Sequence, residues 1–201
     1  MELFYVPGVC SLAPHIALCE SGLKFEAVEV PRDTKMTSKG NFLTINPLGY
    51  VPALRLDNGT VLTECNVILQ YIAEQKLESK LIPKWGTEER WSCVQMLGFI
   101  ATELHKGFGP LFDQKASPES KENALNRISK RFDFLVDRLK GKQFLMGDNF
   151  TVADAYLFTV LNWTPRMKID MSKWPALMGY MEKVKMRPSV QKAMRDEGLL
   201  K

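Results

Sequence analysis

The first thirty residues switch from one secondary-structure pattern to another and back, which limits the folds open to the chain. The apolar and aromatic run from Leu3 to Val6 is typical of a buried strand, and Pro7-Gly8 supplies the turn that ends it. We expect a helix to open near Cys10, and the alternating run from Phe25 to Val30 predicts a second strand. Strand, helix and strand in so short a stretch predict a right-handed βαβ unit with parallel strands.

Cys10 stands at the start of the expected helix and is the first candidate for a reactive sulfur. The first backbone N–H groups of a helix lack partners, and the helix dipole adds partial positive charge there, so both favour a thiolate. Free cysteines also occur as small, unreactive residues of protein cores. The local sequence leaves both interpretations open.

A further pair of strands is expected in the segment from Val51 to Thr63. Two short apolar runs flank an Asp-Asn-Gly turn, which predicts an antiparallel hairpin. Pro52 begins the first of these strands, where proline is tolerated at a sheet edge or after a cis bond. If the bond between Val51 and Pro52 is cis, we expect the backbone of Val51 to be free to pair with a group outside the sheet.

Glu64 follows the hairpin directly and precedes a predicted helix that begins around Cys65. The free N–H groups at such a helix start suit a carboxylate ligand. An acidic residue here can equally be an ordinary cap that the helix dipole stabilises. The sequence alone does not decide between these two roles.

The remainder of the chain carries helical patterns only. The polar segment from Glu74 to Gly86 is interpreted as a linker. We expect a helix from Thr87 to about Phe112, with an apolar stripe that includes Trp91. Ser117-Pro118 predicts another helix start. Thr151 and Asp154 form a capping-box pattern before a run that is apolar nearly all round, so we expect Asp154 to be structural rather than catalytic.

Composition excludes several classes of protein. The 27 basic and 23 acidic residues give a net charge of +4 and are scattered, which does not suggest nucleic-acid binding but suits a small anionic ligand. The four cysteines form no Cys-x-x-Cys pair and have no accompanying histidine cluster, which argues against a zinc site. The sequence has no signal-peptide pattern and no long apolar run, so we expect a soluble, cytoplasmic protein with reduced thiols and no membrane partner.

The order βαβ, hairpin and helix resembles the thioredoxin-like fold, and with its all-helical second half the chain is similar to the glutathione transferases along its whole length. The Cys10-Ser11 pair and the run His105-Lys106-Gly107 are similar to the bacterial beta class, whereas Val51-Pro52 and Glu64 are shared more widely. The implied fold class is α/β plus all-α. A thioredoxin-like, glutathione-binding domain spans residues 1–79, and an all-helical domain that contributes to the electrophile site spans residues 87–201.

The resemblance also implies a site for glutathione as co-substrate, with no other cofactor and no metal. It assigns catalysis to Cys10, as a partner in a mixed disulfide with glutathione, and to His105. Val51 would pair with the peptide backbone of glutathione, Glu64 would meet its ammonium group, and Thr102 would reach the ligand of the neighbouring subunit in a homodimer. The full implied set of binding residues is Cys10, Ser11, Lys35, Val51, Pro52, Glu64, Cys65, Thr102, His105 and Lys106.

Two positions depart from the beta-class pattern. Cys65 replaces a small residue, which would add a thiol at the far end of the ligand from Cys10, and we predict no disulfide between these two cysteines. Gly98 replaces an asparagine that touches glutathione in relatives, so we expect weaker binding.

The resemblance leads to three hypotheses about function. The first is a detoxifying transferase that conjugates glutathione to small apolar electrophiles, in a pocket that draws on Phe108, Phe112 and Trp163. The second is a glutathione-dependent thiol-disulfide oxidoreductase or peroxidase that acts through Cys10. The third is a non-catalytic interaction module of the same fold.

Overall fold

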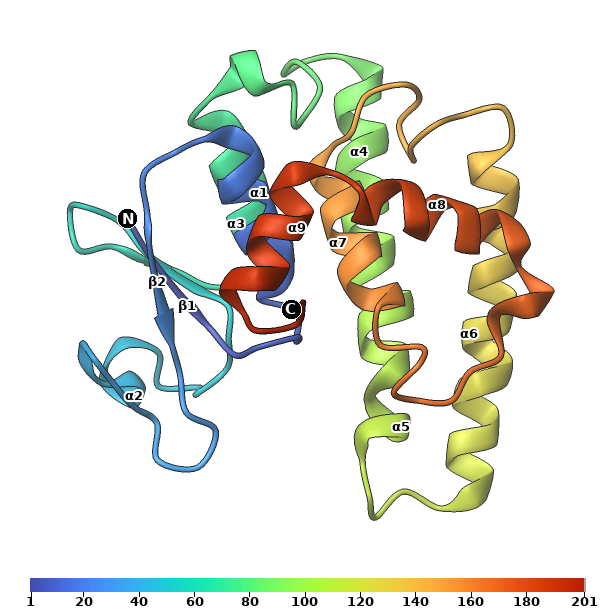
Figure 1. Ribbon diagram of the computed structural model, residues 1–201, viewed down its shortest axis with the longest axis horizontal. Coiled ribbons are helices and arrows are strands. Elements are labelled where there is room, and N and C mark those ends of the chain that lie inside the picture. Colours follow the sequence, from blue (N-terminus) through green and yellow to red (C-terminus); the bar gives the residue numbers. More distant parts are fainter. Residues whose placement is uncertain (201) are drawn as a thin grey trace. The chain divides into compact units, whose positions relative to one another are not determined.

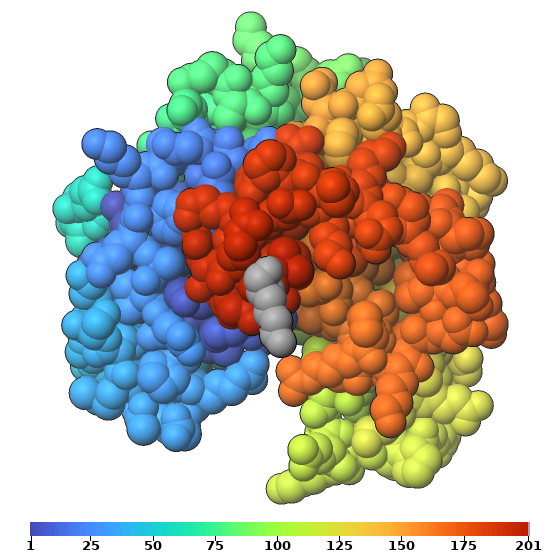
Figure 2. Space-filling view, viewed as in Figure 1, coloured from blue at the N-terminus to red at the C-terminus, as the bar shows by residue number. Residues whose placement is uncertain are grey.

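The computed structural model describes residues 1–200, which form two compact units. The first contains residues 1–82 and the C-terminal segment from Met186, and the second contains residues 83–185. The expected division into residues 1–79 and 87–201 is therefore wrong at the C-terminus. Helix α9 (Pro188–Asp196) packs against α1 (Leu12–Ser21), and the space-filling view shows the red C-terminal residues against the blue N-terminal ones (Figures 1 and 2).

A four-stranded mixed sheet forms the centre of the first unit. Its order is β2-β1-β5-β6, made by β1 (Glu2–Tyr5), β2 (Glu26–Glu29), β5 (Ala53–Arg55) and β6 (Val61–Leu62). Strands β1 and β2 are parallel, and β5 is antiparallel to both β1 and β6. The expected βαβ unit and hairpin are confirmed. A two-stranded ribbon, β3 (Met36–Thr37) and β4 (Gly40–Asn41), and the short α2 (Phe42–Ile45) lie between them.

Strand β1 is buried on both faces, which explains why its four residues are nearly all apolar. Tyr5 points to one face, where its ring lies 5.6 Å from that of His15 in α1. Phe4 points to the other, where its ring lies 5.6 Å from that of Phe42 in α2. Helix α3 (Cys65–Glu74) packs beside α1, as Figure 1 shows. The alternation along β1 thus joins helices on both sides of the sheet.

The second unit is helical, and its first helix changes type along its length. It begins as α4 (Glu88–Phe99), continues as a π-helical turn, η2 (Ile100–His105), and ends in η3 (Lys106–Phe108) and α5 (Gly109–Phe112). Two glycines and Pro110 near its end weaken the regular α pattern. The placement of Trp91 on the buried stripe is wrong: its side chain is 58% exposed and its ring contacts that of Trp85.

Helix α7 (Val152–Leu161) is buried at every position and forms the core of the second unit. Asp154, in its first turn, accepts hydrogen bonds at one oxygen from the Thr151 amide and hydroxyl, both at 2.8 Å. Its other oxygen accepts from the Leu145 amide at 2.8 Å and the Tyr180 hydroxyl at 2.9 Å. The expected structural role of Asp154 agrees with these bonds.

The other helices of the second unit are α6 (Pro118–Leu139), which is capped by the Ser117 hydroxyl as expected, η4 (Met171–Lys173) and α8 (Pro175–Lys185), which packs against α7. The first unit also contains η1 (Leu77–Ser79). Among the helices of residues 1–200, none is both long enough and apolar enough to cross a membrane.

Candidate functional site

Cys10 lies in the turn between β1 and α1, two residues before the helix begins rather than within its first turn. Its thiol donates a hydrogen bond to the carbonyl oxygen of Val51, with Sγ and O 3.2 Å apart. The bond between Val51 and Pro52 is cis, one of the alternatives that the sequence left open. The first unit therefore places the candidate sulfur directly beside the backbone segment that the resemblance assigns to peptide pairing.

Ser11 is fully buried and its hydroxyl is used within the protein. The Oγ atom accepts from the amide of Val6 and donates to the carbonyl oxygen of the same residue, both at 3.1 Å. These two bonds close the turn that carries Cys10. The structure thus gives Ser11 a positioning role that sequence reasoning missed.

Cys65 begins α3, and its buried thiol points back toward Cys10. Its Sγ lies 3.5 Å from the backbone carbonyl oxygen of Cys10, and no disulfide joins the two residues. The expectation that Cys65 adds a thiol at the end of the site remote from Cys10 is therefore wrong. The close packing of α3 against the turn at Cys10 brings the two residues together.

Glu64 and Lys35 share an unusual backbone conformation, with φ angles of 63° and 57°. Non-glycine residues rarely adopt positive φ, and such residues often occur at functional sites. Glu64 is exposed and its carboxylate makes no capping hydrogen bond, which weakens its interpretation as an ordinary helix cap. Within residues 1–200, neither side chain forms an ion pair.

The three candidate residues of the second unit lie along η2 and η3. Thr102 and Lys106 are exposed and four residues apart, and His105 lies between them. The Thr102 hydroxyl donates to the carbonyl oxygen of Gly98 at 3.0 Å. π-Helical turns are rare and are often found at functional sites.

The imidazole of His105 is held by a residue that the sequence analysis did not identify. Nδ1 of His105 lies 2.7 Å from the hydroxyl oxygen of Tyr156 in α7, and the indole of Trp163 packs against the ring at 5.1 Å. Burial lowers the pKa of His105 to about 4, and the adjacent charge of Lys106 acts in the same direction. At neutral pH His105 is an uncharged imidazole that can accept a proton.

Phe108, Phe112 and Trp163 form one aromatic cluster. The Trp163 ring lies 5.5 Å from that of Phe108 and 5.3 Å from that of Phe112. Phe108 is fully buried and Trp163 is 6% exposed, whereas Phe112 is 41% exposed. Phe112 is therefore the member with most surface to offer an apolar ligand, and Phe108 supports the cluster from within.

Comparison with known proteins identifies the family. Residues 9–75 match the family model "Glutathione S-transferase, N-terminal domain", and residues 99–188 match "Glutathione S-transferase, C-terminal domain". The chain is 41% identical to glutathione S-transferase GstA of Escherichia coli O157:H7, over 99% of this chain and 100% of that protein. The chain belongs to the glutathione S-transferase family.

Solved structures give the class within the family. A bacterial beta-class glutathione S-transferase from Sphingomonas chungbukensis is 46% identical with a TM-score of 0.94, and both chains are covered completely. A sphingomonad glutathione S-transferase, solved in complex with glutathione, is 45% identical with a TM-score of 0.95 over the full length of both chains. The expected resemblance to the beta class and the expected fold are confirmed.

Proposed function

We propose that this protein is a transferase that conjugates glutathione to small apolar electrophiles, and that it acts as a cytoplasmic homodimer. The observation that carries the proposal is the distance of 3.2 Å between Cys10 Sγ and the carbonyl oxygen of Val51. A tripeptide that pairs with the Val51 backbone as an added strand has its own sulfur near Cys10. The glutathione complex of the sphingomonad relative supports this choice of ligand.

Charged residues of the first unit suit the two ends of glutathione. The Glu64 carboxylate is exposed, without an ion-pair partner among residues 1–200, and can receive the ammonium group of the ligand. The start of α3 directly after Glu64 offers backbone N–H groups to a carboxylate. The Lys35 ammonium is available for a second carboxylate.

In the reaction, the glutathione thiolate attacks the electrophilic carbon and displaces its leaving group. The proton of the glutathione thiol must first be removed, and a neutral His105 is able to accept it. The role of His105 in this step follows the beta-class resemblance, together with Thr102 and Lys106. Its low pKa, caused by burial, keeps the imidazole neutral near pH 7, so that a ring nitrogen can accept a hydrogen bond from the thiol.

Glutathione affinity tests the proposal through Glu64. Glu64→Gln removes the charge but keeps the shape, and we expect it to weaken glutathione binding about tenfold or more, as the loss of a charge-assisted hydrogen bond does. Glu78→Gln, which changes another exposed glutamate of the same unit, is the matched control. Isothermal titration calorimetry that gives equal affinities for both variants would contradict the proposed ligand position.

A second function, glutathione-dependent disulfide reduction, is favoured by the half-buried Cys10 side chain, which is a thiol and not part of a disulfide. In this reaction the Cys10 thiolate attacks the glutathione sulfur of a mixed disulfide, and the substrate thiolate leaves and takes up a proton. A second glutathione thiolate then attacks the Cys10 adduct, which releases glutathione disulfide and restores the Cys10 thiolate. Each turnover therefore consumes one glutathione thiol and one mixed disulfide and yields one substrate thiol and one glutathione disulfide.

Cys10→Ala separates the two reactions. Conjugation uses the sulfur of glutathione, so we expect Cys10→Ala to retain much of the activity toward an activated aryl halide. Disulfide reduction needs the Cys10 sulfur itself, so the same variant should lose it. If conjugation also collapses while glutathione binding persists, Cys10 takes part in both reactions.

A further inference from the structure

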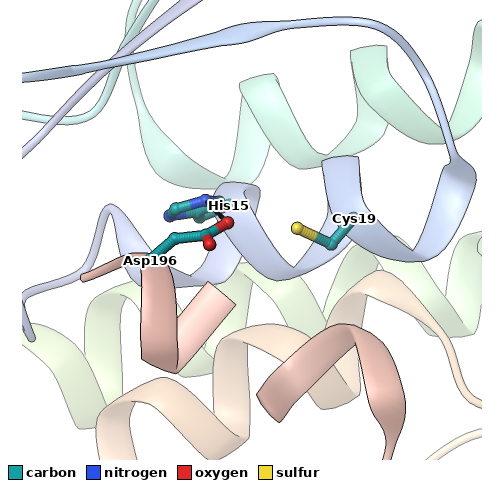
Figure 3. A group of neighbouring side chains, drawn as sticks. All are labelled: His15, Cys19 and Asp196. Atoms are coloured by element: carbon teal, nitrogen blue, oxygen red, sulfur yellow. Dashed lines mark ion pairs between the residues drawn. The ribbon is translucent and has the colours of Figure 1, made fainter. Parts of the chain in front are cut away.

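A cluster of metal-ligand side chains lies in the first unit where α1 meets α9. His15 and Cys19 are four residues apart on α1, so both project from the same side of the helix, and Asp196 is the last residue of α9. One potential ligand atom from each residue lies within 4.8 Å of the other two. Figure 3 shows the Cys19 sulfur pointing toward the Asp196 carboxylate, which lies beside the His15 ring.

His15 supplies an observation that packing alone does not explain. Its side chain is completely buried, yet within residues 1–200 its Nε2 atom has no hydrogen-bond partner. The nearest carboxylate oxygen, Oδ2 of Asp196, is 3.6 Å away. Buried polar atoms nearly always have a partner, so this nitrogen is available to a ligand on the side of Cys19 and Asp196.

The opposite nitrogen of the same ring is firmly held. Nδ1 of His15 lies 2.9 Å from Oε1 of Glu197, a carboxylate that is itself fully buried. The other oxygen of Glu197 accepts the amide of Gly8 at 2.9 Å. A carboxylate on the far nitrogen is the usual support of a metal-binding histidine, since it fixes the tautomer that leaves Nε2 free to bind.

We propose that His15 Nε2, Cys19 Sγ and the Asp196 carboxylate bind one zinc ion, with water as the fourth ligand. Zinc accepts nitrogen, sulfur and oxygen ligands together, whereas magnesium and calcium prefer oxygen alone. A thiolate and a carboxylate supply two negative charges, which balance the charge of the ion. This site revises the sequence-based expectation of no metal, and it goes beyond the proposed transferase function.

Only small movements are needed to form the site. Zinc bonds of roughly 2.0 to 2.3 Å require ligand atoms on the order of 3.5 Å apart, so the present cluster must contract by about 1 Å. His15 is fixed by Glu197, whereas Asp196 is 37% exposed and free to turn about its side-chain bonds. In the free protein the ammonium of Lys192 holds Asp196 at 2.5 Å and must give way to the ion.

The Cys19 thiol must also lose its proton. Burial raises the pKa of Cys19 to about 11, so the free protein carries a neutral thiol at this position near pH 7. Zinc displaces such protons when it binds, because only the thiolate is a good ligand.

Cobalt(II) is the probe for this site, since it adopts zinc geometry and has visible and near-ultraviolet absorption. The chelator-treated, reduced chain is titrated with cobalt in the absence of glutathione, which binds metals itself. We expect one cobalt per chain, a thiolate-to-cobalt charge-transfer band, and displacement of the cobalt by one equivalent of zinc. A chain that gives no such band would overturn the proposal.

Variants on the exposed side of the cluster identify the ligands without disturbing the core. Cys19→Ser should abolish the charge-transfer band, whereas Cys10→Ser, which removes the thiol beside Val51, should keep it. Asp196→Asn should weaken cobalt binding at least tenfold. Its control is Asp137→Asn, another aspartate paired with a nearby lysine, which should leave binding unchanged. A band that persists in Cys19→Ser would assign the cobalt to other thiols and refute the site.

Discussion

The hydroxyl oxygen of Tyr156 lies 2.7 Å from Nδ1 of His105 and joins η2 to the buried helix α7. The contact fixes the orientation of the imidazole, because Tyr156 is only 1% exposed and cannot move away. Because Nδ1 faces Tyr156, Nε2 is the ring nitrogen that remains for other partners. The chemistry proposed for His105 therefore depends on a residue 51 positions later in the chain.

Tyr156→Phe removes this bond and keeps the aromatic ring. We expect kcat/KM for conjugation to fall about fivefold, which corresponds to ~1 kcal/mol for one hydrogen bond. The imidazole nitrogen signals of His105 in a 15N NMR spectrum should shift at the same time. Tyr180→Phe removes a buried hydroxyl that bonds to Asp154, so it should change stability but not the His105 signals. Unchanged signals in Tyr156→Phe would contradict the assignment of Tyr156.

The low pKa of His105 predicts a loss of stability in mild acid. Burial places the folded pKa at about 4, below the ordinary value of ~6.5, so the unfolded chain binds more protons between these values. The free energy of unfolding should therefore be highest above pH 6.5 and fall by up to about 3 kcal/mol as the pH drops to 4. Urea unfolding at several pH values measures this slope. In His105→Gln the fall in the free energy of unfolding between pH 6.5 and pH 4 should be smaller by this amount. An identical fall would exclude His105 as its source.

Glu197 is expected to anchor the C-terminal segment to the first unit. Its carboxylate binds both the completely buried His15 ring and the partly buried Gly8 amide, so its removal leaves a buried ring nitrogen without this partner. Glu197→Ala should lower the free energy of unfolding by about 3 kcal/mol, as the loss of one member of a buried pair does. Arg195→Ala, an exposed neighbour in α9, is the control. Urea unfolding of both variants in the presence of a chelator makes the measurement independent of metal.

Gly98→Asn tests whether the missing asparagine side chain limits glutathione affinity. An added Cβ at Gly98 meets no atom within 4 Å, so a side chain can leave the backbone at this position without a clash at its first carbon. We expect Gly98→Asn to bind glutathione several-fold more tightly than Gly98→Ala, which adds the Cβ without the amide. Equal affinities in calorimetric titration would remove Gly98 as the reason for weaker binding.

Local patterns predicted the elements of the fold because those patterns arise from neighbouring residues. The run from Leu3 to Val6, the turn after Arg55 and the caps at Ser117 and Thr151 each depend on bonds within a few positions. The π-helical turn that ends at His105 was not predicted, because a helix with a changed hydrogen-bond pattern keeps an apolar periodicity similar to that of an α-helix.

Contacts between remote segments limited the prediction of the site. The resemblance named Cys10 and Val51, and the structure brings them into contact. It did not indicate that Ser11 closes a turn or that Tyr156 holds His105, since both roles depend on tertiary packing. The spacing of His15 and Cys19 was visible in the sequence, but their partner Asp196 lies on the last helix of the chain.

The return of α9 to the first unit sets an order for folding during synthesis on the ribosome. The helical residues 83–185 are contiguous, so their unit has all its parts as soon as they leave the exit tunnel. The sheet and α1 emerge earlier but lack the segment that carries Glu197. The carboxylate that binds the His15 ring and the Gly8 amide is synthesised 182 and 189 residues after them, respectively. The half of the protein translated first is therefore the half completed last.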